Sequence, residues 1–188
     1  MNILTKNALF ISNIHGYREN RSTQTALLTM YDRWVKAAAS GQISGTVFLD
    51  LSAAFDLVDH YMLIQKLKIY GLQESALSWI NSYLSNRHQA VWVDHVYSDF
   101  LECKIGVPQG SNLGPLFFLI FFNDLAEEMD NAIDSYADDT TMTARGSTVN
   151  ELELKLGLDC TRVYSWMLQH KLKLNPDKSW SLILGTSE

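Results

Sequence analysis

The sequence predicts an α+β domain in which helices and strands follow one another irregularly. Short apolar runs of strand length alternate with longer segments whose apolar residues recur at helical spacing. The chain has 188 residues, 47% of them hydrophobic, which is enough to bury one sizeable core but hardly two. No repeat, low-complexity tract or Pro/Gly/Ser-rich linker divides the sequence, so we expect a single domain over residues 1–188.

The first quarter of the chain predicts a helix followed by a strand. Residues 23–39 are expected to form a helix that Gly41 ends. The apolar run that follows, 46–51, is short enough to be a buried strand. Asp50 is therefore expected at the C-terminal end of a buried strand.

Two packing helices are expected next. Asp59 is a suitable N-cap for the first of them, and Gly71 is its C-terminal stop. The second helix is expected to place four apolar residues on one face: Ala76, Leu77, Ile80 and Leu84.

The second half of the chain begins with extended structure and turns. Residues 89–104 contain two extended stretches flanking Asp94-His95, which predicts a hairpin, and Gly-Val-Pro-Gln-Gly at 106–110 then breaks the pattern. A helix is predicted from near Pro115 to about Met129.

The last third of the chain predicts a second hairpin and a long helix. Residues 132–143 are expected to form two short strands that meet at 137–139. Residues 148–170 are expected to form a helix, with a final extended pair after it.

Composition and charge limit the functional classes. Cys103 and Cys160 lie far apart, with no Cys or His at ligand spacing, which argues against a zinc module or a disulfide framework and favours a reducing compartment. Residues 1–16 lack the features of a signal peptide, and the longest apolar stretch, 116–122, is too short to span a bilayer. We therefore expect a soluble, intracellular protein without a membrane partner.

The net charge of −6 is unusual for a protein that binds nucleic acid, although a carboxylate centre itself adds negative charge.

Carboxylates fall beside the predicted strands at two places. Asp50 ends one strand, and Asp138 and Asp139 lie between two others. A buried unpaired carboxylate is costly and adjacent like charges repel, and a divalent cation relieves both. Asp50 could equally be a capping or loop residue, and the aspartate pair could be ordinary turn formers. Together the carboxylates could clamp two metal ions for phosphoryl transfer, and oxygen ligands favour Mg²⁺ or Mn²⁺ over zinc.

The segment 106–115 is a third chemical signal. It is too rich in glycine and proline for a helix interior and too apolar for a solvent loop. Glycines let the main chain approach a ligand closely, and Gln109 offers donors and an acceptor to a nucleotide or template strand. The alternative is a tight connection into the Pro115 helix.

Four motifs occur in the order found in reverse transcriptases: FLDLSAAFDLVDH, GVPQGSNLGPLFF, YADD and LKLNPDKS. They resemble those of non-LTR (LINE-type) retrotransposons, and HGYRENRST is similar to the segment that precedes the palm in that family. The resemblance runs from about His15 to the C-terminus. It implies an RNA-directed DNA polymerase with a palm, an antiparallel sheet packed on helices, over about 45–188 with finger-derived insertions. It also implies partial fingers over about 1–44 and no thumb.

The resemblance gives roles to residues in these motifs. Asp50 and Asp138 would be the principal ligands of the catalytic Mg²⁺ (or Mn²⁺) ions, with Asp139 as a less direct third carboxylate. Phe55 would pack under the incoming sugar and collide with a 2′-hydroxyl, although a phenylalanine after a strand is more often a core residue. Gln109 and Gly110 would contact the nucleotide and template. Tyr136 would lie beside the metal-binding pair.

Three basic residues also match the family. Lys178 would donate charge or a proton to the pyrophosphate leaving group, with an ordinary surface lysine as the alternative. Arg18 and Arg21 would hold the triphosphate, because guanidinium groups suit phosphate geometry. The implied partners are an RNA template, a DNA primer, dNTPs and other parts of a retroelement protein.

The chain departs from the family pattern in two respects. Asn112 stands where the family usually has an aliphatic residue, whereas Ala137 is a small residue commonly accepted at its position. Full members of the family also carry an endonuclease before this region and a thumb after it. We therefore expect a truncated retroelement fragment whose activity could be feeble or absent.

Three other functions stay open. A catalytically inactive retroelement remnant would act, if at all, as a binding module, and the missing thumb favours it although no motif is broken. An RNA-synthesising palm polymerase would be expected to have a small residue at Phe55 and a glycine at Ala137. A metal-dependent phosphohydrolase would need a water-activating base and no template channel.

Overall fold

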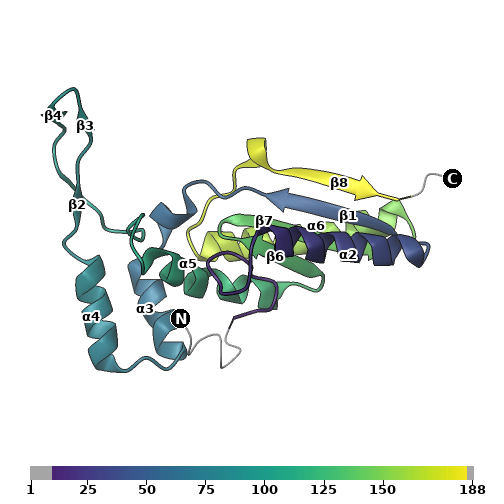
Figure 1. Cartoon of the computed structure of the whole chain (residues 1–188), viewed down its shortest axis with the longest axis horizontal. Helices are drawn as coiled ribbons and strands as arrows, with labels where there is room; N and C mark the ends of the chain where they lie inside the picture. Colours follow the sequence, from purple (N-terminus) through teal and green to yellow (C-terminus); the bar gives the residue numbers. More distant parts are fainter. Residues whose placement is uncertain (1–9, 186–188) are drawn as a thin grey trace.

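The computed structural model describes residues 10–185, in which a four-stranded antiparallel sheet is packed between helices (Figure 1). The strands lie in the order β6 (Ala132–Tyr136), β7 (Asp139–Gly146), β1 (Ile43–Leu49) and β8 (Trp180–Leu184). Each neighbouring pair is antiparallel. The α+β fold class is thus confirmed. Residues 1–9, which hold most of the segment judged for a signal peptide, and residues 186–188 lie outside the described residues.

Side chains cap the N-termini of three helices, of which the cap at Asp59 was predicted. In α2 (Thr23–Ala39), the Ser22 side chain accepts from the Thr25 N–H while the Thr25 side chain accepts from the Ser22 N–H. Asp59 caps α3 (His60–Ile69) by accepting from the Met62 N–H at 3.0 Å. Thr148 caps α6 (Val149–Gln169) in the same way. The remaining helices are α4 (Glu74–Leu84) and α5 (Gly114–Phe122).

The helices α2 and α6 lie on opposite faces of the sheet. A Cβ on Gly45 would lie 2.7 Å from a methyl group of Leu156, so this residue of β1 faces α6. The next residue, Thr46, accepts a hydrogen bond from the Trp34 indole of α2 at 3.0 Å. Because successive strand residues point to opposite faces, α2 covers the face that carries Thr46. That face is polar, since the Thr46 and Thr143 hydroxyls are 3.3 Å apart in the interior.

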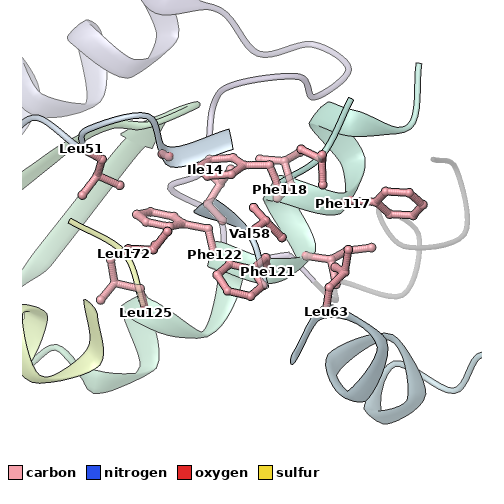
Figure 2. Close-up of a cluster of buried hydrophobic side chains, with 14 of the residues drawn as sticks. Ile14, Leu51, Val58, Leu63, Phe117, Phe118, Phe121, Phe122, Leu125 and Leu172 are labelled. Carbon is pink, nitrogen blue, oxygen red and sulfur yellow. The ribbon is translucent and has the colours of Figure 1, made fainter. Parts of the chain in front are cut away.

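The helix α5 is buried on all sides and forms the centre of the hydrophobic core. Its run of phenylalanines packs between Leu63 of α3 on one side and Leu125 and Leu172 on the other (Figure 2). Phe118 and Phe121 are fully buried. The core therefore extends without interruption from helices α3 and α4 to the four-stranded sheet.

Four sequence predictions need correction. The strand predicted at 46–51 is β1, which begins earlier because β7 pairs with it from Ile43 onward. Ala76 is exposed, because only Leu77, Ile80 and Leu84 of α4 share the buried face.

The helix predicted from Pro115 to Met129 ends at Phe122 and continues as a 3-10 helix at Asn123–Glu128. The α-helix changes to a 3-10 helix at Asn123, whose side chain accepts from the Ile11 N–H and donates to the Tyr70 hydroxyl. Of the final extended pair only β8 is a strand, and Leu174 forms a single bridge to Leu51.

The predicted hairpin at 89–104 is confirmed and projects away from the body beyond α4 (Figure 1). Its inner ladder joins β2 (His88–Gln89) to β5 (Leu101–Glu102), and its outer ladder joins β3 (Trp92–Val93) to β4 (Val96–Tyr97). Asp94 and His95 form the two-residue turn with φ values of 48° and 66°.

Both cysteines are free thiols, as the lack of a disulfide pattern predicted. No helix in residues 10–185 has the length and apolar character needed to cross a membrane.

The core position of Leu63 can be tested by truncation. Leu63→Ala should lower the free energy of unfolding by about 2–5 kcal/mol, because the side chain is completely buried and leaves a cavity. Leu154→Ala on α6, where the side chain is 66% exposed, should change it by less than about 0.5 kcal/mol. Urea unfolding followed by circular dichroism measures both values, and equal values would contradict this description of the core.

Candidate active site

The register of the sheet brings three acidic residues to one end of it. The ladder between β1 and β7 ends at the pair Leu49 and Thr140, so Asp50 and Asp139 follow at the same end. Tyr136 pairs with Asp139, and Ala137-Asp138 forms the turn between them. Burial, and then the charges of Asp138 and Asp50, raise the pKa of the Asp139 carboxyl above its usual value. The three predicted carboxylates therefore lie within electrostatic reach of one another.

The carboxylates suit a hard divalent cation by their chemistry. All their donor atoms are oxygens, and a cation would relieve the repulsion that raises the pKa of Asp139. Among residues 10–185, however, no three His, Cys, Asp or Glu side chains are close enough together to hold a metal ion. The side chains would have to converge to bind one. Their role as ligands stays a prediction.

The N-terminal segment around His15 is hydrogen-bonded to β6 and lies against the turn between β6 and β7. The His15 N–H donates to the Ser135 carbonyl at 2.8 Å, and the Ser135 N–H donates to the Asn13 carbonyl at 3.0 Å. Ala137 has the left-handed φ of 59°, and a Cβ on Gly16 would lie 2.4 Å from its nitrogen. Only glycine therefore fits between this segment and the turn.

A cleft of about 290 Å³ opens beside this turn. Its lining brings together residues from three of the sequence motifs and from the N-terminal segment: Tyr17, Ala53, Ala54, Phe55, Pro108, Gln109, Gly110, Pro115 and Asp138. Four of the predicted site residues, Phe55, Gln109, Gly110 and Asp138, thus share one cleft. Tyr136 is 37% exposed and lies next to the turn, outside that lining.

Phe55 forms part of both the core and the cleft. Its ring stacks on Phe118 of α5 at 4.3 Å between centroids, while its other side remains partly exposed in the cleft. Tyr17 meets it edge-on at 6.2 Å. Tyr17 was not among the predicted site residues, because within HGYRENRST only the arginines were expected to contact a ligand.

The loop 106–110 is fixed to the segment that follows Asp50. The Gly106 N–H donates to the Val58 carbonyl and the Val107 N–H to the Phe55 carbonyl, each at 2.8 Å. The Gln109 amide donates to the Asp56 carboxylate at 2.8 Å. The loop therefore forms a wall of the cleft as well as the connection into α5.

Lys178 is held beside the end of β1. It lies in a 3-10 helix, Pro176–Lys178, and its side chain is exposed. The Asn175 N–H donates to the Asp50 carbonyl at 2.9 Å, and the Asp50 N–H donates to the Ser179 hydroxyl at 3.1 Å. The segment that carries Lys178 is thus anchored to Asp50 by the Asn175 backbone on one side and the Ser179 side chain on the other.

The two arginines are not part of the cleft lining in the described residues. Arg18 donates to the carbonyls of Ile11 and Ile14 at 2.7 and 3.1 Å, and burial lowers the pKa of its guanidinium. Arg18 therefore supports the N-terminal segment in this structure, and Arg21 is exposed. A contact of either with a triphosphate stays a prediction.

Comparison with known families now identifies the fold and motifs. The model of the family described as reverse transcriptase (RNA-dependent DNA polymerase) matches residues 1–183. The chain belongs to this reverse transcriptase family. The resemblance to non-LTR retrotransposon enzymes is also confirmed by its curated relatives.

Two relatives of this reverse transcriptase are polymerases of mobile elements. It is 30% identical to the "Probable RNA-directed DNA polymerase from transposon BS" of Drosophila melanogaster, over 94% of the chain and 20% of that protein. It is 28% identical to the RNA-directed DNA polymerase from mobile element jockey of the same species, over 87% of the chain and 19% of that protein. The chain thus spans about a fifth of the length of these relatives.

Solved structures share the fold at low identity. A structure of apo telomerase from Candida tropicalis, truncated from its C-terminal domain, matches 99% of the chain and 39% of its own length, with a TM-score of 0.72 and 16% identity. A second Candida tropicalis telomerase structure, in complex with a telomeric RNA fragment, matches with a TM-score of 0.68 and 16% identity, over 96% of this chain and 32% of its own. The fold is consistent with a polymerase palm.

Two glycines with the same backbone conformation test the attachment of the 106–110 loop. Gly106 and Gly71 both have φ of 87°, but a Cβ on Gly106 would lie 2.7 Å from the Asp56 carbonyl oxygen, whereas Gly71 has open space. Gly71→Ala should cost about 1–2 kcal/mol of unfolding free energy for the left-handed conformation. Gly106→Ala should cost about 1–3 kcal/mol more, because the added Cβ overpacks the contact. Similar losses in urea unfolding would mean that the loop can move away from Asp56.

Proposed function

We propose that the chain is the catalytic core of an RNA-directed DNA polymerase that adds dNTPs to a primer 3′-hydroxyl. The observation that carries the proposal is the cleft in which Phe55 of one motif and Gln109 and Gly110 of another meet Asp138, at the end of the sheet where the three aspartates lie. Membership of the reverse transcriptase family supports the same chemistry.

We assign metal binding to the three aspartates. Asp50 and Asp138 bind Mg²⁺ (or Mn²⁺) as principal ligands, and Asp139 is the third carboxylate. Two such ions would activate the attacking hydroxyl and stabilise the leaving phosphate oxygen. The Asn175 N–H donates to the Asp50 carbonyl and the Asp50 N–H donates to the Ser179 hydroxyl, so the backbone that carries this ligand at the end of β1 is fixed.

The cleft lining provides nucleotide selection. The exposed side of the Phe55 ring packs under the sugar, and its stack on Phe118 prevents it from moving away from a 2′-hydroxyl. Gln109 and Gly110 contact the nucleotide and the template from the opposite wall, and Tyr136 supports the turn. Lys178, held beside Asp50, neutralises charge on the pyrophosphate. Arg18 and Arg21 are the further cations, and they would hold the triphosphate.

A second cleft of about 580 Å³ gives the template a path. It adjoins the 290 Å³ cleft that would take the nucleotide, because both clefts are lined by Pro108 and Gln109. Arg87 and Lys104 are among its other lining residues and supply the positive charge that phosphates need. We assign about 1–44 to partial fingers and about 45–188 to a palm with finger-derived insertions, and other parts of a retroelement protein would complete the binding of template and primer.

A catalytically inactive remnant is the second candidate. It is favoured by the absence, in residues 10–185, of three acidic side chains close enough to share a metal ion. In that case the same clefts would act only as a binding module.

Primer extension separates the two candidates. On poly(rA)–oligo(dT) with Mg²⁺ and dTTP, the parent chain should extend the primer, and the Asp138→Asn, Asp139→Asn double variant should lose more than about 100-fold in rate. The loss follows from removing two of the three carboxylates. Glu153→Gln, which removes an exposed carboxylate on α6, is the control and should keep the parent rate. No extension by folded parent protein would establish the inactive remnant instead.

Sugar selection gives an independent test of Phe55. Phe55→Ala should raise the use of rUTP relative to dTTP, as the ratio of kcat/KM values, by roughly tenfold or more, because the 2′-hydroxyl no longer meets the ring. The control is Phe100→Ala on the exposed hairpin, which should leave the ratio unchanged. An unchanged ratio in Phe55→Ala would assign the ring to the core alone.

A further inference from the structure

A buried ion pair lies on the polar face of the sheet, close to the turn that carries Asp138. Asp134 of β6 is only 2% exposed and precedes Asp138 by four residues. The Arg33 guanidinium of α2 donates to its Oδ2 atom. His15 is equally buried, with its Nε2 atom 3.9 Å from Asp134 Oδ1. We call Arg33, Asp134 and His15 the buried polar cluster.

The cluster joins three separate elements. Arg33 comes from α2, Asp134 from β6 and His15 from the N-terminal segment. The other ring nitrogen of His15 shares a hydrogen bond of 2.9 Å with the Thr25 hydroxyl in the first turn of α2. The backbone of His15 pairs with Ser135, and the next residue, Gly16, lies against Ala137 of the turn. A continuous path of direct contacts thus connects α2 to the aspartate turn.

The charge in this cluster is hard to explain by stability alone. An ion pair with a buried carboxylate gains little net stability, because the cost of removing Asp134 from water offsets its attraction to Arg33, whose side chain is 24% exposed. Burial, and then the charge of Arg21, lower the pKa of His15, so Arg33 supplies the positive charge opposite Asp134 at neutral pH. In the described residues, His15 Nε2 and Asp134 Oδ1 have no hydrogen-bond partner, which adds a further cost.

The cluster instead specifies the register of an edge strand. Within residues 10–185, β6 pairs with β7 on one side and only with the short N-terminal segment on the other. A slip of one residue would turn Asp134 from the α2 face to the apolar face, where Ile133 packs in the core. That placement would bury an unpaired carboxylate, which costs several kcal/mol. The same slip would move Asp138 out of the cleft.

We propose that Arg33 and Asp134 are positioning residues, whose ion pair fixes the register of β6 and thereby the placement of Asp138 and Asp139. His15 completes the cluster by joining the N-terminal segment to Asp134 and, through Thr25, to α2. The catalytic part of this inference rests on the proposed polymerase function, whereas the structural part, the ordering of the turn, does not.

The test separates positioning from stability by replacing the whole pair. In Arg33→Met alone, the Asp134 carboxylate stays buried without its partner, and stability should fall sharply. The double variant Arg33→Met, Asp134→Leu removes both charges and should recover stability close to that of the parent in urea unfolding. The matched control is Lys36→Met, Asp32→Leu, which removes an exposed ion pair between residues on either side of Arg33 in α2.

Hydrogen exchange of the backbone amides gives the readout that needs no activity. In the double variant, exchange of the amides at 135–140 should become at least about tenfold faster while β1 and α6 keep their protection. The control should match the parent throughout. Unchanged exchange at 135–140, or a loss spread over the whole sheet, would overturn the proposal.

Metal binding and catalysis then test the consequence for the site. The double variant should bind Mn²⁺ about tenfold more weakly in calorimetric titration and should lose kcat in primer extension with little change in the KM for dTTP. Parent-like Mn²⁺ affinity and kcat in the double variant would overturn the positioning role. If the parent itself neither binds Mn²⁺ nor extends a primer, the proposed function fails, and the exchange result still decides whether the ion pair orders the turn.

Discussion

The antiparallel pairing of β1 with β7 is the contact on which the rest of the structure depends. It runs from Ile43 opposite Gly146 to Leu49 opposite Thr140, and it is the longest ladder in the described residues. Because side chains alternate along a strand, this one register decides which residues meet the core and which meet α2. It also places Asp50, from the first third of the chain, beside Asp138 and Asp139, which come some ninety residues later.

The candidate site is built mainly by backbone hydrogen bonds between loops and strand ends. The 106–110 loop is bonded to the carbonyls of Phe55 and Val58, and the 3-10 helix before β8 is bonded to Asp50. Backbone bonds of this kind fix the path of a loop without depending on the side chains it carries. Of the side chains that line the cleft, Phe55 is held in place by the phenylalanine core behind it, and Gln109 is held by its hydrogen bond to Asp56.

Local signals predicted the helices well, and tertiary contacts explain where prediction failed. Ser22, Asp59 and Thr148 each cap a helix whose start was expected, because capping depends on residues within one turn. The extra length of β1 and the early end of α5 depend on partners far away in sequence, so no local pattern could reveal them. For the site, the motifs led to four of the nine residues that line the cleft, whereas Tyr17 enters it only because the N-terminal segment pairs with β6. How closely the three carboxylates approach one another likewise depends on side-chain positions that a sequence motif does not specify.

The projecting hairpin has a consequence for how the protein behaves in solution. Its apolar side chains, including Trp92, Tyr97 and Phe100, are exposed, and its two ladders are each two residues long. A two-stranded hairpin without further packing is marginally stable and leaves unpaired strand edges open to other chains. Residues 88–102 contain no lysine or arginine, so trypsin has no cleavage site there, whereas chymotrypsin has several. Limited digestion with these two proteases would therefore cut the same molecule in different places, and the hairpin is where purified protein would first begin to aggregate.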